Sequence, residues 1–137
     1  MTIKAQQNGR YVVVNTLLNT TDTTIVDQMN GRIGDSGRLV YFAAKDGMQA
    51  HDLTGQDAFI RAKDAAGKIK QVTGIKERIK PSAGLFSMYL PAEFYQASGQ
   101  IEEAYLAITD NEGNVISSVP LTFRVLENNM IITSNGS

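Results

Sequence analysis

Hydrophobic and polar residues alternate along several segments of the chain with a repeat of two. Such a repeat is typical of β-strands that bury one face against a core. Four segments show it, with these inward positions: Ala58, Ile60 and Ala62 in residues 58–63; Phe86, Met88 and Leu90 in 85–90; Ala104, Leu106 and Ile108 in 101–109; Val119, Leu121, Phe123 and Val125 in 119–125.

Two further runs, residues 11–18 and 39–44, are apolar on both faces. That pattern predicts central strands, or strands that are covered on both sides. Residues 75–80 alternate weakly and are charged, which predicts an edge strand, because charge on an edge discourages stray pairing.

Turn signals separate these segments. Asp46-Gly47, Ala66-Gly67-Lys68 and Asn111-Glu112-Gly113-Asn114 favour hairpin connections, since Gly and Asn accept positive φ at low cost. Residues 91–97 open with proline and are followed by Ser98-Gly99, which predicts one short helix anchored by Phe94. The fold class expected is all-β, an immunoglobulin-like antiparallel β-sandwich with this one short helix.

Composition narrows the possible functions. The chain has 137 residues, no cysteine and a formal net charge of −1, which fits one domain. The near-neutral charge argues against nucleic-acid binding. No apolar run is long enough to span a membrane, and the first seven residues are not a secretory signal. We predict no cofactor, no metal site and no membrane partner.

The titratable residues do not suggest catalysis. His51 is the single histidine, and we expect it to be a solvated loop residue, because dyads and zinc sites need further partners. Residues 110–114 superficially resemble a calcium loop but lack its spaced acidic ligands, so a turn is expected. Glu102 and Glu103 are adjacent and would point to opposite faces of a strand. No catalytic residue is predicted.

Two charged regions are candidates for contacts with a protein partner. Residues 31–38 form a glycine-rich loop that leads into a strand, so it offers no phosphate-binding helix terminus. A basic stretch follows in residues 63–80, for which a solvated, aggregation-resistant edge is the alternative interpretation. The contact residues predicted from the two regions are Arg32, Asp35, Arg38, Lys76, Arg78 and Lys80.

The order of motifs resembles a known family. Gly34-Asp35-Ser36-Gly37-Arg38 precedes an apolar strand, followed by Asp52-Leu53-Thr54-Gly55, a strand ending in Lys63-Asp64-Ala65-Ala66-Gly67, and Gly84-Leu85-Phe86. Leu90-Pro91-Ala92-Glu93-Phe94, the strand at residues 103–108 and the closing Phe123-Arg124-Val125-Leu126 complete the series. This order, over residues 11–126, resembles the N-terminal domain of baseplate upper proteins of phages that infect Gram-positive bacteria.

The resemblance implies a virion structural protein and not an enzyme. Its domain would dock onto the core of the tail baseplate and support the machinery that binds the host receptor. The partners implied are other tail and baseplate proteins and further copies of the chain in a homo-oligomer. The location implied is the virion, after assembly from the bacterial cytoplasm. We expect an N-terminal arm at residues 1–10, the docking domain at 11–126, and a polar tail or linker start at 127–137.

The alternative function is a non-catalytic carbohydrate-binding module on a cell-wall-directed protein, which is also a β-sandwich in many cases. Such modules stack sugars on exposed aromatic rings. Tyr11, Tyr89, Tyr95 and Tyr105 are the possible platforms in a chain without tryptophan. An enzyme would need titratable groups converging in a pocket, and the linear sequence contains no such cluster.

Overall fold

The chain folds into strands connected by short turns. A computed structural model describes residues 2–17 and 22–127. The strands are β1 (Thr2–Lys4), β2 (Gln7–Asn8), β3 (Tyr11–Asn15), β4 (Thr23–Ile25), β5 (Gly31–Arg32), β6 (Gly37–Asp46), β7 (Gln49–Ala50), β8 (Asp57–Lys63), β9 (Ile69–Thr73), β10 (Glu77–Lys80), β11 (Leu85–Pro91), β12 (Gly99–Thr109) and β13 (Val115–Leu126). Three short 3-10 helices join them: η1 (Asp27–Met29), η2 (Pro81–Ala83) and η3 (Ala92–Tyr95).

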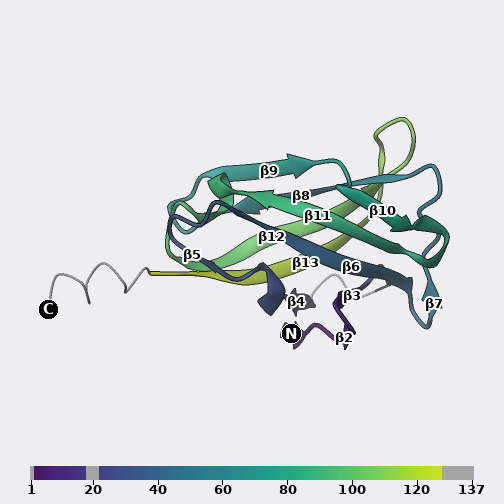
Figure 1. Ribbon diagram of the computed structural model, residues 1–137, viewed down its shortest axis with the longest axis horizontal. Helices are drawn as coiled ribbons and strands as arrows, with labels where there is room; N and C mark the ends of the chain where they lie inside the picture. Colours follow the sequence, from purple (N-terminus) through teal and green to yellow (C-terminus); the bar gives the residue numbers. More distant parts are fainter. Residues whose placement is uncertain (1, 18–21, 128–137) are drawn as a thin grey trace, which may run out of the picture.

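Two sheets pack against each other (Figure 1). Sheet A has the order β1-β4-β13-β12-β8-β9, with β5 also beside β13. Sheet B has the order β10-β11-β6-β3-β2, with β7 also beside β6. This arrangement confirms the predicted all-β sandwich, whereas the immunoglobulin-like detail stays a prediction.

The sheets are mixed, which corrects the purely antiparallel expectation. β3 pairs with β6 in parallel, and β13 pairs in parallel with both β4 and β5. The parallel β3–β6 pair arises because the chain leaves sheet B after β3, contributes β4 and β5 to sheet A, and then returns to sheet B as β6. A hairpin turn cannot make such a connection, since parallel neighbours need a crossover.

The core lies between the sheets and contains the inward positions that the alternation predicted. These side chains are at most 5% exposed in all four segments. Phe42 of β6 stacks on Phe86 of β11 with ring centroids 5.5 Å apart. Each fully buried aliphatic or phenylalanine side chain contributes about 1.5–3 kcal/mol relative to an exposed one, so the core is the main source of stability.

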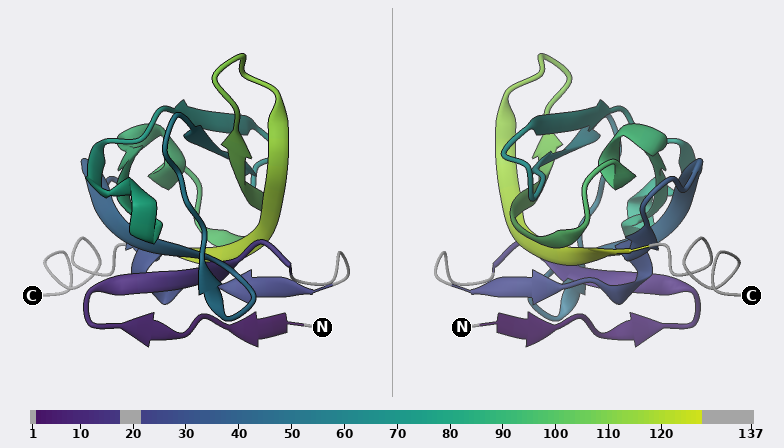
Figure 2. Two further views of the ribbon diagram at one scale, coloured as in Figure 1. Left: turned by 90° about the vertical axis from the view of Figure 1, so that its right-hand side faces the viewer. Right: turned by 90° about the vertical axis from the view of Figure 1, so that its left-hand side faces the viewer.

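The edge strands of the two sheets are joined at both open sides of the sandwich (Figure 2): β9 to β10 on one side, and β1 to β2 on the other. Between β9 and β10, Gly74 donates to Ala58 of sheet A and Lys76 donates to Ser87 of sheet B, both at 2.8 Å between backbone N and O. On the opposite side, residues 1–10 were expected to be an arm, and this segment contributes β1 to sheet A and β2 to sheet B. Whether it also reaches a neighbouring protein stays a prediction.

The expected helix at residues 91–97 is wrong in type and length. Pro91 is the last residue of β11, where it pairs with Gly37, and only Ala92–Tyr95 form a 3-10 turn. Phe94 and Tyr95 are both fully buried in this turn, so the predicted anchoring role of Phe94 is confirmed. The Tyr95 hydroxyl donates to the carbonyl of Met29 at 2.8 Å, and burial raises the pKa of Tyr95 to about 12.

A bulge in β12 replaces the simple alternation expected around Glu102 and Glu103. Ile101 pairs with Phe123 and Ala104 with Leu121, so two residues of β12 lie opposite the single residue between those partners in β13. The extra residue lets both Ile101 and Ala104 face the core, and it leaves both glutamates exposed. Glu103 lies 3.7 Å from Lys63 Nζ, in a solvent-exposed ion pair.

Candidate docking surfaces

The loop before β6 brings the first predicted contact trio together. The Asp35 carboxylate accepts a hydrogen bond from the backbone N of Arg32 at 2.9 Å and lies 3.7 Å from the Arg38 guanidinium. The Arg32 side chain donates to the carbonyl of Glu127 at 3.0 Å. β5 also pairs with the end of β13, and Ile33 donates to Leu126. The trio therefore lies where β13 ends.

The second predicted trio lies on β10 and the turn before it. Lys76, Arg78 and Lys80 are all exposed, and Arg78 is 3.6 Å from Asp57. β10 pairs with the beginning of β11, near Leu85, whereas the loop trio adjoins the end of β11 through the Arg38–Leu90 pair. The two trios are thus at opposite ends of β11 and do not form one cluster.

Lys70, part of the predicted basic stretch, is mostly buried. Its side chain is 12% exposed, donates to Gln96 Oε1 at 2.8 Å and approaches Asp64 at 3.9 Å. The Asp64 carboxylate also accepts bonds from the backbone of Ala66 and Lys68, which closes the β8–β9 turn. This lysine has an internal structural role and does not belong to the exposed basic surface.

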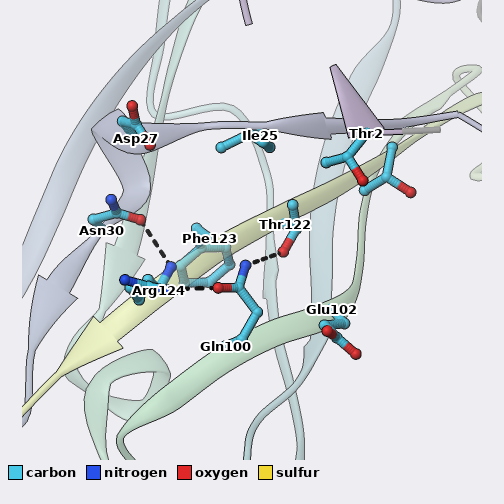
Figure 3. A pocket seen from close by; sticks show the side chains of 10 residues that line it. Thr2, Ile25, Asp27, Asn30, Gln100, Glu102, Thr122, Phe123 and Arg124 are labelled. Carbon is cyan, nitrogen blue, oxygen red and sulfur yellow. Dashed lines mark hydrogen bonds between the residues drawn. The ribbon is translucent and has the colours of Figure 1, made fainter. Parts of the chain in front are cut away.

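Sequence reasoning missed a groove of about 650 Å³ on the outer side of β1, β4, β13 and β12 (Figure 3). Inside it, Gln100 donates to the Thr122 hydroxyl at 2.5 Å and accepts from Arg124 at 3.4 Å. The Asn30 side chain accepts the backbone N–H of Arg124 at 2.8 Å, in the gap between β4 and β5. The only signal in the sequence was the break of alternation at Glu102, which lines the groove.

The expectation that His51 is a solvated loop residue is wrong. Its side chain is only 13% exposed. Nδ1 lies 2.8 Å from Asp46 Oδ1, and Nε2 lies 2.8 Å from Gln56 Oε1. Thr16 also donates to Asp46, and this bond, followed by that of His51, holds the pKa of the Asp46 carboxyl below its ordinary value. The histidine joins the β6–β7 hairpin to the following loop.

The predicted turn at residues 110–114 is confirmed. The Asp110 carboxylate accepts backbone N–H groups of Glu112 and Asn114, each at 2.9 Å. These bonds, that of Asn114 first, lower the pKa of Asp110. Across residues 2–17 and 22–127, no group of histidine, cysteine or acidic side chains has the arrangement of a metal site. In the same residues, no helix is long and apolar enough to cross a membrane.

The four tyrosines considered as sugar platforms do not form one surface. Tyr95 is fully buried, which removes it from the set. Tyr105 alternates with buried Ala104 and Leu106 and so faces outward from sheet A, whereas Tyr11 and Tyr89 face outward from sheet B.

The fold and these surfaces are those of a β-sandwich module that presents loops and sheet edges around a closed core. The model of the baseplate upper protein (BppU) N-terminal domain family matches residues 11–135, and the chain belongs to this family. A solved structure with the same fold is the N-terminal domain of phage TP901-1 ORF48, with a TM-score of 0.58 and 14% identity over 93% of this chain and 99% of that one. No curated protein matches the chain.

Membership of this family confirms the resemblance that the order of motifs in the sequence indicated. The chain is a phage baseplate structural protein, located in the virion tail, where it interacts with other tail proteins. The family is structural and generally non-enzymatic.

Proposed function

We propose that this domain docks onto proteins of the baseplate core and supports the receptor-binding machinery of the tail. The observation that carries the proposal is the family match over residues 11–135. A docking domain needs a rigid scaffold with exposed loops and edges, and both are present here. The sandwich core is closed, and the segments that cross between the sheets are bonded to both of them.

The loop trio of Arg32, Asp35 and Arg38 is the first contact region in this proposal. Bonds between Arg32, Asp35 and the end of β13 hold the loop in one conformation. A preorganised loop loses little conformational entropy when it binds. Its position at the end of β13 couples the contact to the residues that follow, which the proposal assigns to a polar tail or linker start at 127–137.

The basic trio of Lys76, Arg78 and Lys80 is the second contact region. These side chains are exposed on an edge strand, where positive charge steers an acidic partner and raises the association rate. Baseplate proteins occur in many copies, so each contact can be modest. The proposal therefore includes a homo-oligomer in the assembled particle and folding in the bacterial cytoplasm before assembly.

The test is a binding assay of the purified chain against each tail protein encoded beside its gene, followed by mass determination of the complex in solution. A stoichiometric complex with a baseplate-core protein is the expected result, and its mass gives the copy number. Arg32→Glu and Lys80→Glu should each weaken it, whereas Glu112→Gln in the β12–β13 turn should not. A folded chain that binds none of these proteins would rule the proposal out.

A further inference from the structure

The outer face of sheet B is unusually apolar for a surface that no other element covers. Register places Tyr11 beside Tyr41, Val13 beside Ala43, and Leu39 beside Tyr89 on adjacent strands. Each of these residues alternates with a buried neighbour, so the side chains point away from the core. We name this surface the tyrosine face and define it by Tyr11, Val13, Leu39, Tyr41, Leu85 and Tyr89. Ala43 lies among them but is only 4% exposed, and Ser87, beside Tyr41, is buried and donates to Glu77 at 2.9 Å.

Both segments predicted from the sequence to be apolar on two faces contribute to the tyrosine face. Residues 11–18 and 39–44 were expected to be central strands, or strands that are covered on both sides. The structure covers the inward side, where Val12, Val14 and Phe42 are fully buried. On the outward side Leu39 remains 38% exposed and Tyr89 41% exposed. Within the described residues, no strand or helix packs over this side, so its exposed side chains are available to another molecule.

Arg10 and Lys45 supply the positive charge on this face, and Glu77, bonded to Ser87, supplies one carboxylate. The Arg10 guanidinium lies 4.1 Å from the centroid of the Tyr41 ring and 5.4 Å from that of Tyr11. In the described part of the chain it forms no ion pair with a carboxylate, and its one hydrogen bond is to the Tyr11 hydroxyl at 3.5 Å. Lys45 continues the same side of β6. A stacked arginine and tyrosines on a partly exposed apolar surface are the residue types enriched at binding hot spots.

The chemistry of the face selects among possible occupants. The face carries two cations, Arg10 and Lys45, and one carboxylate, Glu77, so a second copy related by a two-fold axis would meet the same net positive charge, which is unfavourable. A platform for a sugar chain would need several free aromatic faces, but Tyr11 and Tyr41 meet edge to face at 81° and Arg10 covers Tyr41, which leaves Tyr89 alone of the three. A protein surface with an apolar centre and a carboxylate opposite Arg10 satisfies both the rings and the guanidinium.

We propose that the tyrosine face is the central docking surface of this domain and that it receives an acidic, partly apolar surface of another baseplate protein. This inference rests on the proposed function and specifies where the partner binds. Lys80 of the second predicted trio pairs with Leu85 of the face, so it lies on the polar rim of this interface.

The experiment measures the dissociation constant between the full chain and the tail protein that wild type binds. Leu39→Thr with Tyr41→Thr removes the apolar centre but keeps residues that favour strands, and it should weaken binding by about thirtyfold. Arg10→Glu should weaken it by at least about tenfold, whereas Arg10→Lys retains most of the affinity, because the charge remains. Arg61→Glu on the outer face of sheet A is the matched control and should leave affinity unchanged. Melting temperatures verify that each variant folds.

The outcomes separate this inference from the proposed function. If wild type binds no tail protein, both fail. If wild type binds and the Arg10 and Leu39/Tyr41 variants bind equally well, only the tyrosine face is rejected. Equal weakening by Arg61→Glu would also reject it. Loss of a dimer of the chain in sedimentation, or loss of binding to purified cell-wall polysaccharide, caused by the same variants would identify a different occupant and overturn the proposal.

Discussion

Both sheets carry an arginine against aromatic rings on the outer face, but the two clusters differ in how their polar groups are bonded. On sheet A, Arg61 donates to Gln71 at 2.8 Å and to the Tyr105 hydroxyl at 3.2 Å, with the Phe59 ring 5.6 Å away. On sheet B, Arg10 lies against Tyr41, and its one hydrogen bond within residues 2–17 and 22–127 is to the Tyr11 hydroxyl at 3.5 Å.

The difference teaches that residue type alone does not identify a docking surface. The arginine of sheet A is satisfied by its own cross-strand neighbours, so a partner would have to break those bonds. Among the described residues, the arginine of sheet B keeps donors available, and the rings it contacts, Tyr11 and Tyr41, lie beside the apolar Val13 and Leu39 on the same strands. A surface whose polar groups are already paired is suited to solvent, whereas one with unpaired donors beside apolar groups is suited to a partner.

The largest effect on this comparison should come from Gly37→Ala, which disturbs the tyrosine face directly. Gly37 has φ +132, and a Cβ there would lie 2.6 Å from Cζ of Tyr89. The substitution combines backbone strain with a clash and should lower the free energy of unfolding by about 3 kcal/mol. Gly113→Ala, at φ +85 with open space around it, should cost about 1 kcal/mol. Urea unfolding measures both, and equal losses would show that Tyr89 does not depend on Gly37.

A medium effect is expected in double-mutant cycles on the free chain. Arg61 and Tyr105 share a hydrogen bond, so Arg61→Ala and Tyr105→Phe should couple by about 1 kcal/mol. Arg10→Ala and Tyr41→Leu should couple by about 0.5 kcal/mol, the value of an exposed cation–π contact. The free energy of unfolding of the single and double variants gives both numbers. A reversed order would contradict the contrast between the two faces.

The smallest expected effect is the pH dependence of the free energy of unfolding that comes from one carboxylate at the end of each sheet. The pKa values of Asp46 at the β6–β7 hairpin and of Asp110 at the β12–β13 turn are lowered in the folded chain. A lowered folded pKa stabilises the protein above the unfolded value of about 3.9, and this stability is lost as pH falls through the folded pKa.

Asp46→Asn should therefore lower the free energy of unfolding at neutral pH. The difference in this free energy from wild type should disappear as the pH falls through the folded pKa of Asp46. Asp110→Asn should behave in the same direction. Urea unfolding at neutral and acidic pH measures this, with Gln49→Ala as a control that carries no titrating group. A difference for Asp46→Asn that stays constant down to low pH would contradict the assignment.

Much of the fold could be predicted from the sequence, because alternation reports directly which side of a strand meets the core. The strands at residues 58–63, 85–90, 101–109 and 119–125 were found in this way, within a few residues of their ends. β1, β2, β4, β5 and β7 were missed because they are two or three residues long and show no period. β9 was missed because its outward Ile69 is apolar and its inward Lys70 is charged, which obscures the alternation.

The surfaces were harder to predict, because they depend on side chains from distant segments. Arg32, Asp35 and Arg38 are close in sequence, and the structure brings them together. The groove beside Gln100 and Thr122 requires the parallel β4–β13 pair, which no local pattern indicates. The tyrosine face was present in the sequence as two runs apolar on both sides, but only the tertiary structure shows which side remains uncovered.

The pairing of β4 and β5 with β13 also determines when the chain can fold. β1 reaches sheet A only through β4, and β4 and β5 pair with the last strand of the chain. During synthesis, β4 and β5 must wait until residue 126 has left the ribosome before they can pair with β13. Contacts between segments far apart in sequence slow folding, so the domain completes sheet A as a single late event, once β13 is available.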